Sequence, residues 1–337
     1  MTHRADVVRH ASAQRPARVR STCLCIVLFL FIAAYGLNGL SAEPAHAALH
    51  TERAAQPNVV RLSVLTYNIH GLPRWIARDD PETRIPAILA KARAFDLVLL
   101  QEDFAYQALV DAASRWRHVQ RGTPPDGSWL GVSGDGLTLL TDAQLIGARA
   151  ALPYGTCNGW LRASSDCFAN KGALLQRVRI ANGAELDVWT THLDAGRGSA
   201  DQQVRARQLQ LLAQRIATHS AGRAVILAGD FNLHWDVPRD RDVLSSFLRG
   251  LRLTIAARVP DTGGKKRVDY VLFRPAADIT MDVLRSGVDE HFVDAAGEPL
   301  SDHPAVYAEF AIGTRPAARA AQRGEQLRSG SNPWRGF

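Results

Sequence analysis

A chain of 337 residues, 46% hydrophobic and 22% charged, has the composition of a globular protein with room for one large domain or two ordinary ones. The net charge of +7 resides at the two ends: residues 1–47 carry +3, residues 313–337 carry +4, and residues 48–312 are neutral. A neutral body argues against a large electropositive groove for nucleic acid, although it does not exclude a local basic patch.

The first 47 residues have the pattern of an export signal. Three arginines between positions 15 and 20 precede an apolar run from Cys23 to about Leu40, and the small residues of Ala45-His46-Ala47 follow. This order predicts a secretory signal peptide over residues 1–47, cut near Ala47, and hence a periplasmic or secreted protein. The alternative is an uncleaved N-terminal membrane anchor, because the apolar run approaches the minimum length that spans a bilayer.

The C-terminal residues 313–337 are rich in Arg, Ala, Gly, Ser and Gln and show no apolar period, which predicts a basic disordered tail. Between residues 59 and 312 the chain has no internal repeat and no convincing break. We therefore expect a single domain over residues 58–312.

The first half of this domain alternates strands with helical segments. Val59–Ile69 alternates β-branched and polar residues, as a half-buried strand does, and Pro81–Phe95 has apolar residues at helical spacing after Asp80, a candidate N-cap. The run LVLL within Asp96–Leu100 is typical of a strand buried on both faces. The other elements predicted here are a helix over Phe104–Trp116 and two strands between Gly136 and Leu152.

The second half is organised around Ala224–His234, which reads AVILAGDFNLH. Its apolar run suits a doubly buried strand, and Phe231 can anchor the following turn in the core while Asp230 and Asn232 project together from the strand's end. That arrangement suits a hydrated cation or a phosphate oxygen, although an ordinary turn uses the same residue types. The other elements predicted here are a strand over Ala173–Ile180, a hairpin turn at Asn182-Gly183, a strand over Leu186–Thr191, a helix over Asp201–His219, and strands over Lys266–Phe273 and Ala305–Ile312.

Two of the four cysteines would leave with the signal peptide. Cys157 and Cys167 flank a polar loop, and an exported protein would pair them in a disulfide that stabilises the fold by about 2–3 kcal/mol. A pair of free surface thiols is the alternative.

Several predicted strands end in polar side chains suited to catalysis: Asn68, Glu102, His192, Asp230 with Asn232, and Asp302 with His303. Glu102 can supply the carboxylate that Mg²⁺ needs, although Gln101-Glu102-Asp103 also suits a first helical turn. Asp302-His303 can supply a general base, since imidazole titrates near neutrality.

Two further residues have both a catalytic and a structural interpretation. Asp269 lies inside a predicted strand, where an unpaired carboxylate would be costly; a hydrogen bond to a histidine would remove that cost, and a salt bridge with Lys or Arg is the alternative. His192 can bind a phosphoryl oxygen as negative charge develops in the transition state, although a lone strand-end histidine also fits a purely structural role.

These residues stand in six motifs: TYNIHG, LLQE, TTHLDAG, AGDFN, VDYVLF and LSDHPAV. In this order, and over about Arg61–Phe310, the motifs resemble the endonuclease/exonuclease/phosphatase superfamily, which includes DNase I-like nucleases, inositol-polyphosphate 5-phosphatases and neutral sphingomyelinases. The resemblance implies a four-layer α/β/β/α sandwich, in which two mixed sheets pack face to face with helices outside, and a metal site at one edge.

The resemblance also implies the metal side of the site. Glu102 would be the principal ligand of Mg²⁺, or of Mn²⁺ or Ca²⁺ in its place, with Asn68 beside it and Asp302 in support. The reaction would be metal-assisted hydrolysis of a phosphoester by in-line attack of water.

The remaining residues would have catalytic roles. His303 would be the general base, oriented by Asp269. Asp230 and Asn232 would position the nucleophile and the phosphate, and His192 would stabilise the transition state.

Three features favour a phospholipid substrate and the neutral sphingomyelinase-like branch. The first two are the predicted export and the neutral charge of the body. The third is that the segment NKGAL at residues 170–174, the motif THLDAG and the helix after it resemble the sphingomyelinase pattern. We expect a monomer with peripheral membrane contact, although no membrane-inserting hairpin is evident and Trp129, Trp160 and Phe168 fit a role in capping the core. The alternatives are a secreted DNase I-like endonuclease, for which Lys265-Lys266-Arg267 offers only a short basic run, and a non-catalytic binding module.

Overall fold

A computed structural model describes residues 58–124, 134–159, 167, 169–259 and 267–315. These residues all belong to one compact unit spanning Ala54–Phe337. The predicted signal peptide, the tail from residue 316 onward, and Trp129, Trp160 and Phe168 lie outside the described residues. Within the described ranges, no helix is long and apolar enough to cross a membrane.

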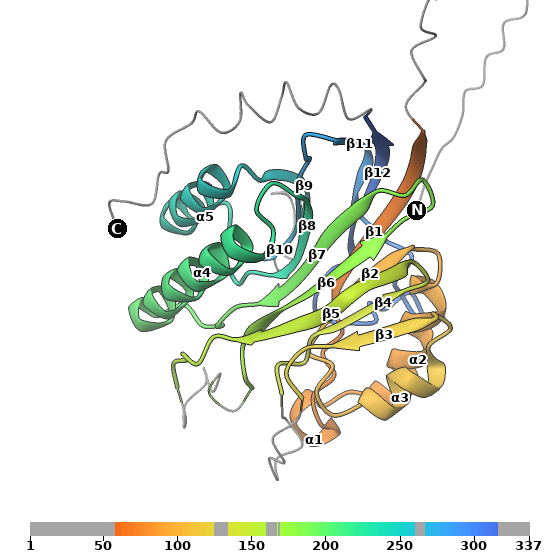
Figure 1. The fold of residues 1–337 in the computed structure, drawn as a ribbon. Coiled ribbons are helices and arrows are strands. Elements are labelled where there is room, and N and C mark those ends of the chain that lie inside the picture. Colours follow the sequence, from red (N-terminus) through yellow and green to blue (C-terminus); the bar gives the residue numbers. More distant parts are fainter. Residues whose placement is uncertain (1–57, 125–133, 160–166, 168, 260–266, 316–337) are drawn as a thin grey trace, which may run out of the picture. The chain divides into compact units, whose positions relative to one another are not determined.

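The first sheet has six strands in the order β11-β12-β1-β2-β4-β3 (Figure 1). At its centre β1 and β2 run parallel with Asn68 opposite Gln101, while the other neighbours pair antiparallel. Parallel strands end at the same edge of a sheet, so Asn68 and the residue after Gln101 come together. The strands are β1 (Val59–Asn68), β2 (Leu97–Gln101), β3 (His118–Arg121), β4 (Thr138–Thr141), β11 (Ile279–Val288) and β12 (Val306–Thr314).

The second sheet has the order β5-β6-β7-β8-β10-β9. Here β7 and β8 run parallel with His192 opposite Asp230, and the antiparallel β10 places Asp269 on the other side of Asp230. The sheet therefore aligns three of the predicted site residues in one row. Its strands are β5 (Gln144–Pro153), β6 (Gly172–Arg179), β7 (Glu185–His192), β8 (Ala224–Asp230), β9 (Thr254–Arg258) and β10 (Asp269–Arg274).

Helices cover the outer face of each sheet. Figure 1 shows α2 (Pro81–Ala92) and α3 (Gln107–Ala113) on one side and α4 (Ser199–His219) and α5 (Pro238–Leu251) on the other, while α1 (Arg74–Ala77) follows β1. One apolar cluster joins residues of both sheets, and two further clusters join each sheet to its helices. These layers confirm the predicted four-layer sandwich.

The position of the central strands, which are covered on both faces, explains why their sequences are continuously apolar. In β8, Ile226 packs between the sheets while Val225 and Leu227 pack against α4 and α5. All seven residues of β8 are buried. Because both faces are covered, apolar side chains are favoured at every position of the strand rather than at every second one.

The structure confirms the hairpin turn predicted at Asn182-Gly183 and the disulfide predicted between Cys157 and Cys167. Gly183 adopts φ +83° between β6 and β7, and its N–H donates to the Ile180 carbonyl at 2.9 Å. Cys157 and Cys167 are bonded to each other, with their Cα atoms 5.2 Å apart.

Other boundaries differ from the predicted ones. The helix expected over Phe104–Trp116 is shorter, because Ser114 turns extended and Trp116 packs into the core, where its indole N–H donates to the Phe95 carbonyl at 3.4 Å. The last strand continues to Thr314, so Gly313 and Thr314 belong to β12 and not to the tail. We did not anticipate α1, β3, α5, β9 and β11.

Candidate active site

Residues from both sheets meet at the edge where β1, β2, β7 and β8 end. The Asn68 amide Nδ2 donates to Glu102 Oε1 at 2.9 Å and to Asp230 Oδ2 at 3.2 Å. Asn68 ends β1 of the first sheet, Glu102 directly follows β2, and Asp230 ends β8 of the second sheet, so this single amide links the two sheets. Residues 162 positions apart in the sequence are thereby brought into direct contact.

Glu102 directs its carboxylate into this cluster from an unusual backbone conformation. Its φ is +59°, and its side chain is 17% exposed. Its second carboxylate oxygen, Oε2, is buried and has no hydrogen-bond partner among the described residues. His70 and Asn232, at the same edge, also have positive φ, of +48° and +49°. Strained backbone of this kind often occurs at functional sites.

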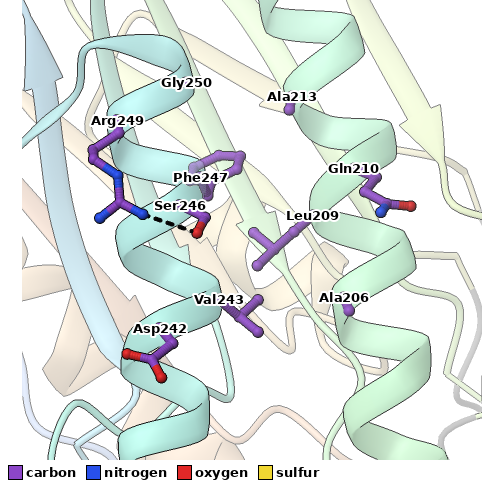
Figure 2. A pocket seen from close by; sticks show the side chains of 10 residues that line it. All are labelled: Ala206, Leu209, Gln210, Ala213, Asp242, Val243, Ser246, Phe247, Arg249 and Gly250. Carbon is purple, nitrogen blue, oxygen red and sulfur yellow. Dashed lines mark hydrogen bonds between the residues drawn. The ribbon is translucent and has the colours of Figure 1, made fainter. Parts of the chain in front are cut away.

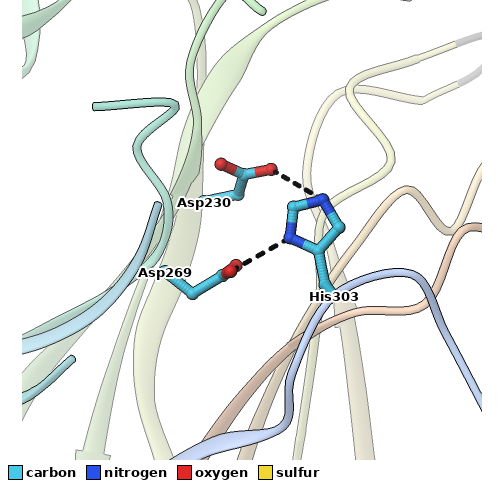
Figure 3. A group of neighbouring side chains, drawn as sticks. All are labelled: Asp230, Asp269 and His303. Carbon is cyan, nitrogen blue, oxygen red and sulfur yellow. Dashed lines mark hydrogen bonds and ion pairs between the residues drawn. The ribbon is translucent and has the colours of Figure 1, made fainter. Parts of the chain in front are cut away.

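His303 and Asp269 form a buried pair (Figure 3). His303 Nδ1 lies 3.0 Å from Asp269 Oδ2, and His303 Nε2 lies 3.7 Å from Asp230 Oδ2. His303 and Asp269 are almost fully buried. Asp269 thus contacts a histidine rather than the Lys or Arg of the structural alternative.

The loop that carries His303 is fastened to the end of β1. The Ser301 hydroxyl donates to the Asn68 carbonyl at 2.6 Å and accepts the N–H of His303 at 3.3 Å. This contact sets the position of the imidazole relative to Asn68. Asp302 lies between the two buried residues with its side chain exposed, and its predicted metal role stays a prediction.

His192 lies on the opposite side of Asp230. Its Nε2 is 3.5 Å from Asp230 Oδ2 and 3.9 Å from Glu102 Oε1. The Nζ of Lys171, a buried lysine, is 3.0 Å from the same nitrogen. We did not count Lys171 among the site residues, although it stands in the NKGAL segment that resembles the sphingomyelinase pattern.

Asn232 and Phe231 complete the turn after β8. The Asn232 amide donates to the Leu193 carbonyl at 2.9 Å, and its backbone N–H donates to Asp230 Oδ1 at 2.9 Å. Phe231 is fully buried and packs edge-on against Tyr270, with ring centroids 5.5 Å apart. The buried aromatic ring anchors the turn, as the sequence predicted, while the phosphate-side role of Asn232 stays a prediction.

The electrostatics of the cluster are dominated by Asp230. Burial raises the pKa of its carboxyl group; His303 opposes this rise, the negative Asp269 adds to it, and the Asn232 N–H and Lys171 oppose it. A carboxylate in this environment is stabilised by added positive charge.

The donor set fits a hard divalent cation. Mg²⁺ prefers carboxylate and amide oxygens, and the Oε2 atom of Glu102 is a buried carboxylate oxygen without a hydrogen bond in the part of the chain that the structure describes. Asp230, Asp269 and His303 also offer ligand atoms within 4.8 Å of one another, but His303 and Asp269 already contact each other. The Glu102 carboxylate is therefore the better candidate ligand for a cation, and the metal roles of Glu102 and Asn68 stay predictions.

A separate pocket of about 600 Å³ lies between α4 and α5 (Figure 2). Leu209, Val243 and Phe247 give it a largely apolar lining. None of the site residues described above lines it.

The comparisons with known proteins agree with this architecture. The model of the endonuclease/exonuclease/phosphatase family matches residues 65–303. A sphingomyelinase of Mycobacterium tuberculosis strain H37Rv is 30% identical over 265 residues, which cover 72% of this chain and 51% of the relative, and one of Mycobacterium bovis is equally similar. The chain therefore spans about half the length of the curated relatives it matches.

Solved structures with lower sequence identity share the fold. Sphingomyelinase C of Streptomyces griseocarneus has a TM-score of 0.56 and 21% identity, covering 76% of this chain and all of that one. D. rerio TDP2, complexed with a single-strand DNA product, has a TM-score of 0.57 and 17% identity over 74% of this chain and 98% of that one. A double mutant of Staphylococcus aureus beta toxin, which has bound magnesium ions, has a TM-score of 0.54 and 16% identity over 74% of this chain and 99% of that one.

Proposed function

Because the chain belongs to the endonuclease/exonuclease/phosphatase family, we propose that it is an exported, monomeric, Mg²⁺-dependent phosphodiesterase that cleaves a phospholipid of the sphingomyelin type. The coarser statement, that it hydrolyses phosphoester bonds, follows from the family and the sphingomyelinase relatives. The observation that carries the proposal is the convergence of Asn68, Glu102, Asp230 and His303 on one edge of the two sheets.

The His303–Asp269 pair is suited to take a proton from water. Asp269 contacts Nδ1 and favours the tautomer whose proton lies there, which leaves the lone pair of Nε2 available. Nε2 faces Asp230, so water near that carboxylate lies within reach of the base. These tautomer and protonation assignments follow from the contacts around the ring.

The opposite side of the site is suited to bind the phosphate. The Lys171 ammonium and the His192 imidazole lie next to each other in a buried environment, where a positive charge stabilises a phosphoryl oxygen more strongly than it does in water. A cation held by Glu102, with Asn68 and Asp302 as the other proposed ligands, would supply further stabilisation of the developing negative charge.

Support for a lipid over a nucleic acid comes from several directions. The matched relatives of known name are sphingomyelinases, and the folded body has no net charge. Arg267, the described member of the basic run at residues 265–267, is 2.9 Å from the Asp236 carboxylate and is thereby partly neutralised. The fold is also shared with TDP2 bound to DNA, which keeps a secreted nuclease as the second candidate.

A parallel assay of three substrates tests the proposal. The protein, with Mg²⁺ or with EDTA, is incubated with sphingomyelin vesicles, plasmid DNA and a soluble bis-aryl phosphodiester. We expect phosphocholine release and aryl phosphodiester hydrolysis that both stop in EDTA. DNA nicking without phosphocholine release would overturn the lipid assignment, and full activity in EDTA would overturn the metal dependence.

Export has its own test. N-terminal sequencing of the mature protein should find a start near residue 48. A mature chain that retains residues 1–47 would favour the membrane anchor instead.

A further inference from the structure

An exposed tryptophan lies on α1, the short helix that follows β1. Trp75 is 67% exposed and Ile76 37% exposed, and no residue of α1 is buried. Leu72, which is partly exposed, lies just before the helix, ahead of the extended Pro73. Trp75 is the most exposed of the large apolar side chains in the described part of the protein.

Contacts at both ends hold α1 to the rim of the active site. Before the helix, the Gly71 carbonyl accepts the N–H of Ala105 at 3.1 Å, and a Cβ on Gly71 would lie only 2.5 Å from the Glu102 carbonyl oxygen. After the helix, Asp79 Oδ2 lies 3.3 Å from His70 Nδ1 and 3.0 Å from the Arg84 guanidinium. The exposed tryptophan is therefore part of an ordered projection, seven residues after Asn68.

The charges around α1 balance one another. Arg74 is exposed and pairs with Asp80 at 2.9 Å, and the exposed Arg78 precedes Asp79. With Arg84 beside Asp79 and Glu82 beside Asp80, three guanidinium and three carboxylate groups give this surface no net charge, so it has no long-range attraction for an anionic surface or for nucleic acid. A headgroup with both a phosphate and a quaternary ammonium matches such a surface, and indole rings favour the interface between water and lipid.

We propose that α1 docks the protein on a zwitterionic phospholipid bilayer, with Trp75 and Ile76 entering the interface and Arg74 and Arg78 contacting headgroup phosphates. The proposal rests on the proposed function, because docking through α1 places the rim of the active site against the layer that contains the phosphodiester. Hydrophobic insertion provides the binding free energy, and the salt dependence is correspondingly weak.

Vesicle partition of the full mature chain tests the proposal. Vesicles of equal parts phosphatidylcholine and sphingomyelin are used in EDTA, so that turnover is stopped, and bound protein is separated by flotation. We expect Trp75→Ala and Ile76→Ser each to weaken partition at least about fivefold, since each removes buried apolar area from the interface. Raising NaCl from about 0.05 to about 0.5 M should change wild-type partition by less than about twofold.

A matched variant and a soluble substrate make the result specific. Leu284 on β11 is also an exposed apolar residue, at 43%, and Leu284→Ser should leave partition unchanged. Hydrolysis of the soluble bis-aryl phosphodiester in Mg²⁺ should be the same in all variants, whereas hydrolysis of vesicular sphingomyelin should fall with partition. Loss of soluble-substrate activity in every protein, wild type included, would instead count against the proposed function.

Three results would overturn the docking surface. The first is wild-type partition by Trp75→Ala, and the second is binding that requires anionic lipid. The third is a loss of soluble-substrate turnover in Trp75→Ala alone, which would place the indole in the catalytic site.

Discussion

Glu102 combines a left-handed backbone with a buried carboxylate oxygen that has no hydrogen bond to any described residue. Each feature is unfavourable, since a non-glycine residue in a sparsely populated conformation costs about 1–3 kcal/mol and an unsatisfied buried polar atom a similar amount. A bound cation would compensate the unsatisfied carboxylate oxygen, although it would not change the backbone conformation. At the scale of single residues, both features support the proposal that Glu102 holds a cation.

Removing the Glu102 carboxylate should separate these two effects. We expect Glu102→Ala to lower turnover of the soluble phosphodiester at least about a hundredfold, because the principal cation ligand is lost. The melting temperature without metal should be kept or raised, whereas the increase produced by Mg²⁺ should disappear. Differential scanning fluorimetry with and without Mg²⁺ gives the second readout, and an undiminished Mg²⁺ shift in the variant would contradict the assignment.

A second histidine of the chain, His291, also contacts an aspartate and can serve as a control for His303. His291 Nδ1 also lies close to an aspartate, 2.8 Å from Asp289 Oδ1, but its side chain is 94% exposed. We expect His303→Ala to lower turnover at least about a hundredfold and His291→Ala to leave it unchanged, because only the former has a buried, oriented imidazole next to Asp230. Steady-state kinetics of both variants provide the measurement, and near-normal turnover of His303→Ala would exclude it as the base.

At the scale of elements, Arg84 of α2 connects two loops that carry site residues. Its guanidinium donates to the carbonyl oxygens of Ile69 at 2.9 Å, His70 at 3.0 Å and Leu300 at 2.8 Å. The first two follow Asn68, and the third lies three residues before His303. A planar group with several donors in fixed directions can bind all three carbonyls, which a lysine ammonium cannot do with the same geometry.

Replacement of Arg84 should therefore misplace the catalytic groups without removing any of them. We expect Arg84→Lys to lower kcat for the soluble phosphodiester by about tenfold or more with little change in KM, since a small displacement of reacting groups is costly. Arg93→Lys is the control, because Arg93 pairs with Asp142 and lies over the Trp116 ring rather than contacting the loops that carry site residues. Added guanidinium should partly restore Arg84→Ala but not Arg93→Ala. Equal kcat values for Arg84→Lys and wild type would show that Arg84 does not position the site.

At the scale of the whole molecule, Asp135 makes stability depend on pH. Its carboxylate accepts the N–H of Thr123 at 2.7 Å and of Leu137 at 3.1 Å, next to Gly172 of the other sheet. Burial raises its pKa to about 6, against the opposing effect of these hydrogen bonds. A group whose pKa is higher in the folded state favours folding while protonated, so its contribution is complete below pH 4 and is lost as the pH rises through about 6.

The Asp135→Asn variant should lack this component. A difference of about two pKa units corresponds to about 3 kcal/mol, so the stability of the variant relative to wild type should rise by up to that amount between about pH 4 and about pH 7. Urea unfolding of both proteins across this range measures the difference, in which the other titrating groups cancel. A difference that stays constant with pH would show that Asp135 does not titrate there.

The shortened helix and the unanticipated strand β3 share a physical cause, which is packing between residues far apart in the sequence. The predicted helix over Phe104–Trp116 had suitable local composition, but burial of Trp116 against Phe95 ends it early. The strand β3 is four residues long and none of them is fully buried, so its sequence shows little alternation of buried and exposed residues. Its formation depends on pairing with β4. Long-range pairing and packing override weak local preference in such segments.

The sequence alone determined the strands buried on both faces, the hairpin at Asn182-Gly183, the family and the polar residues at strand ends, because these depend on local composition and on motifs in order. Only the tertiary structure decided which atoms meet. The Asn68 amide bridges two sheets to reach Asp230, Lys171 lies against His192, and α1, with its exposed Trp75, follows the Gly71 that packs against the Glu102 backbone. Such contacts depend on strand order and register, which arise from packing between residues far apart in the chain, so that no stretch of sequence contains them.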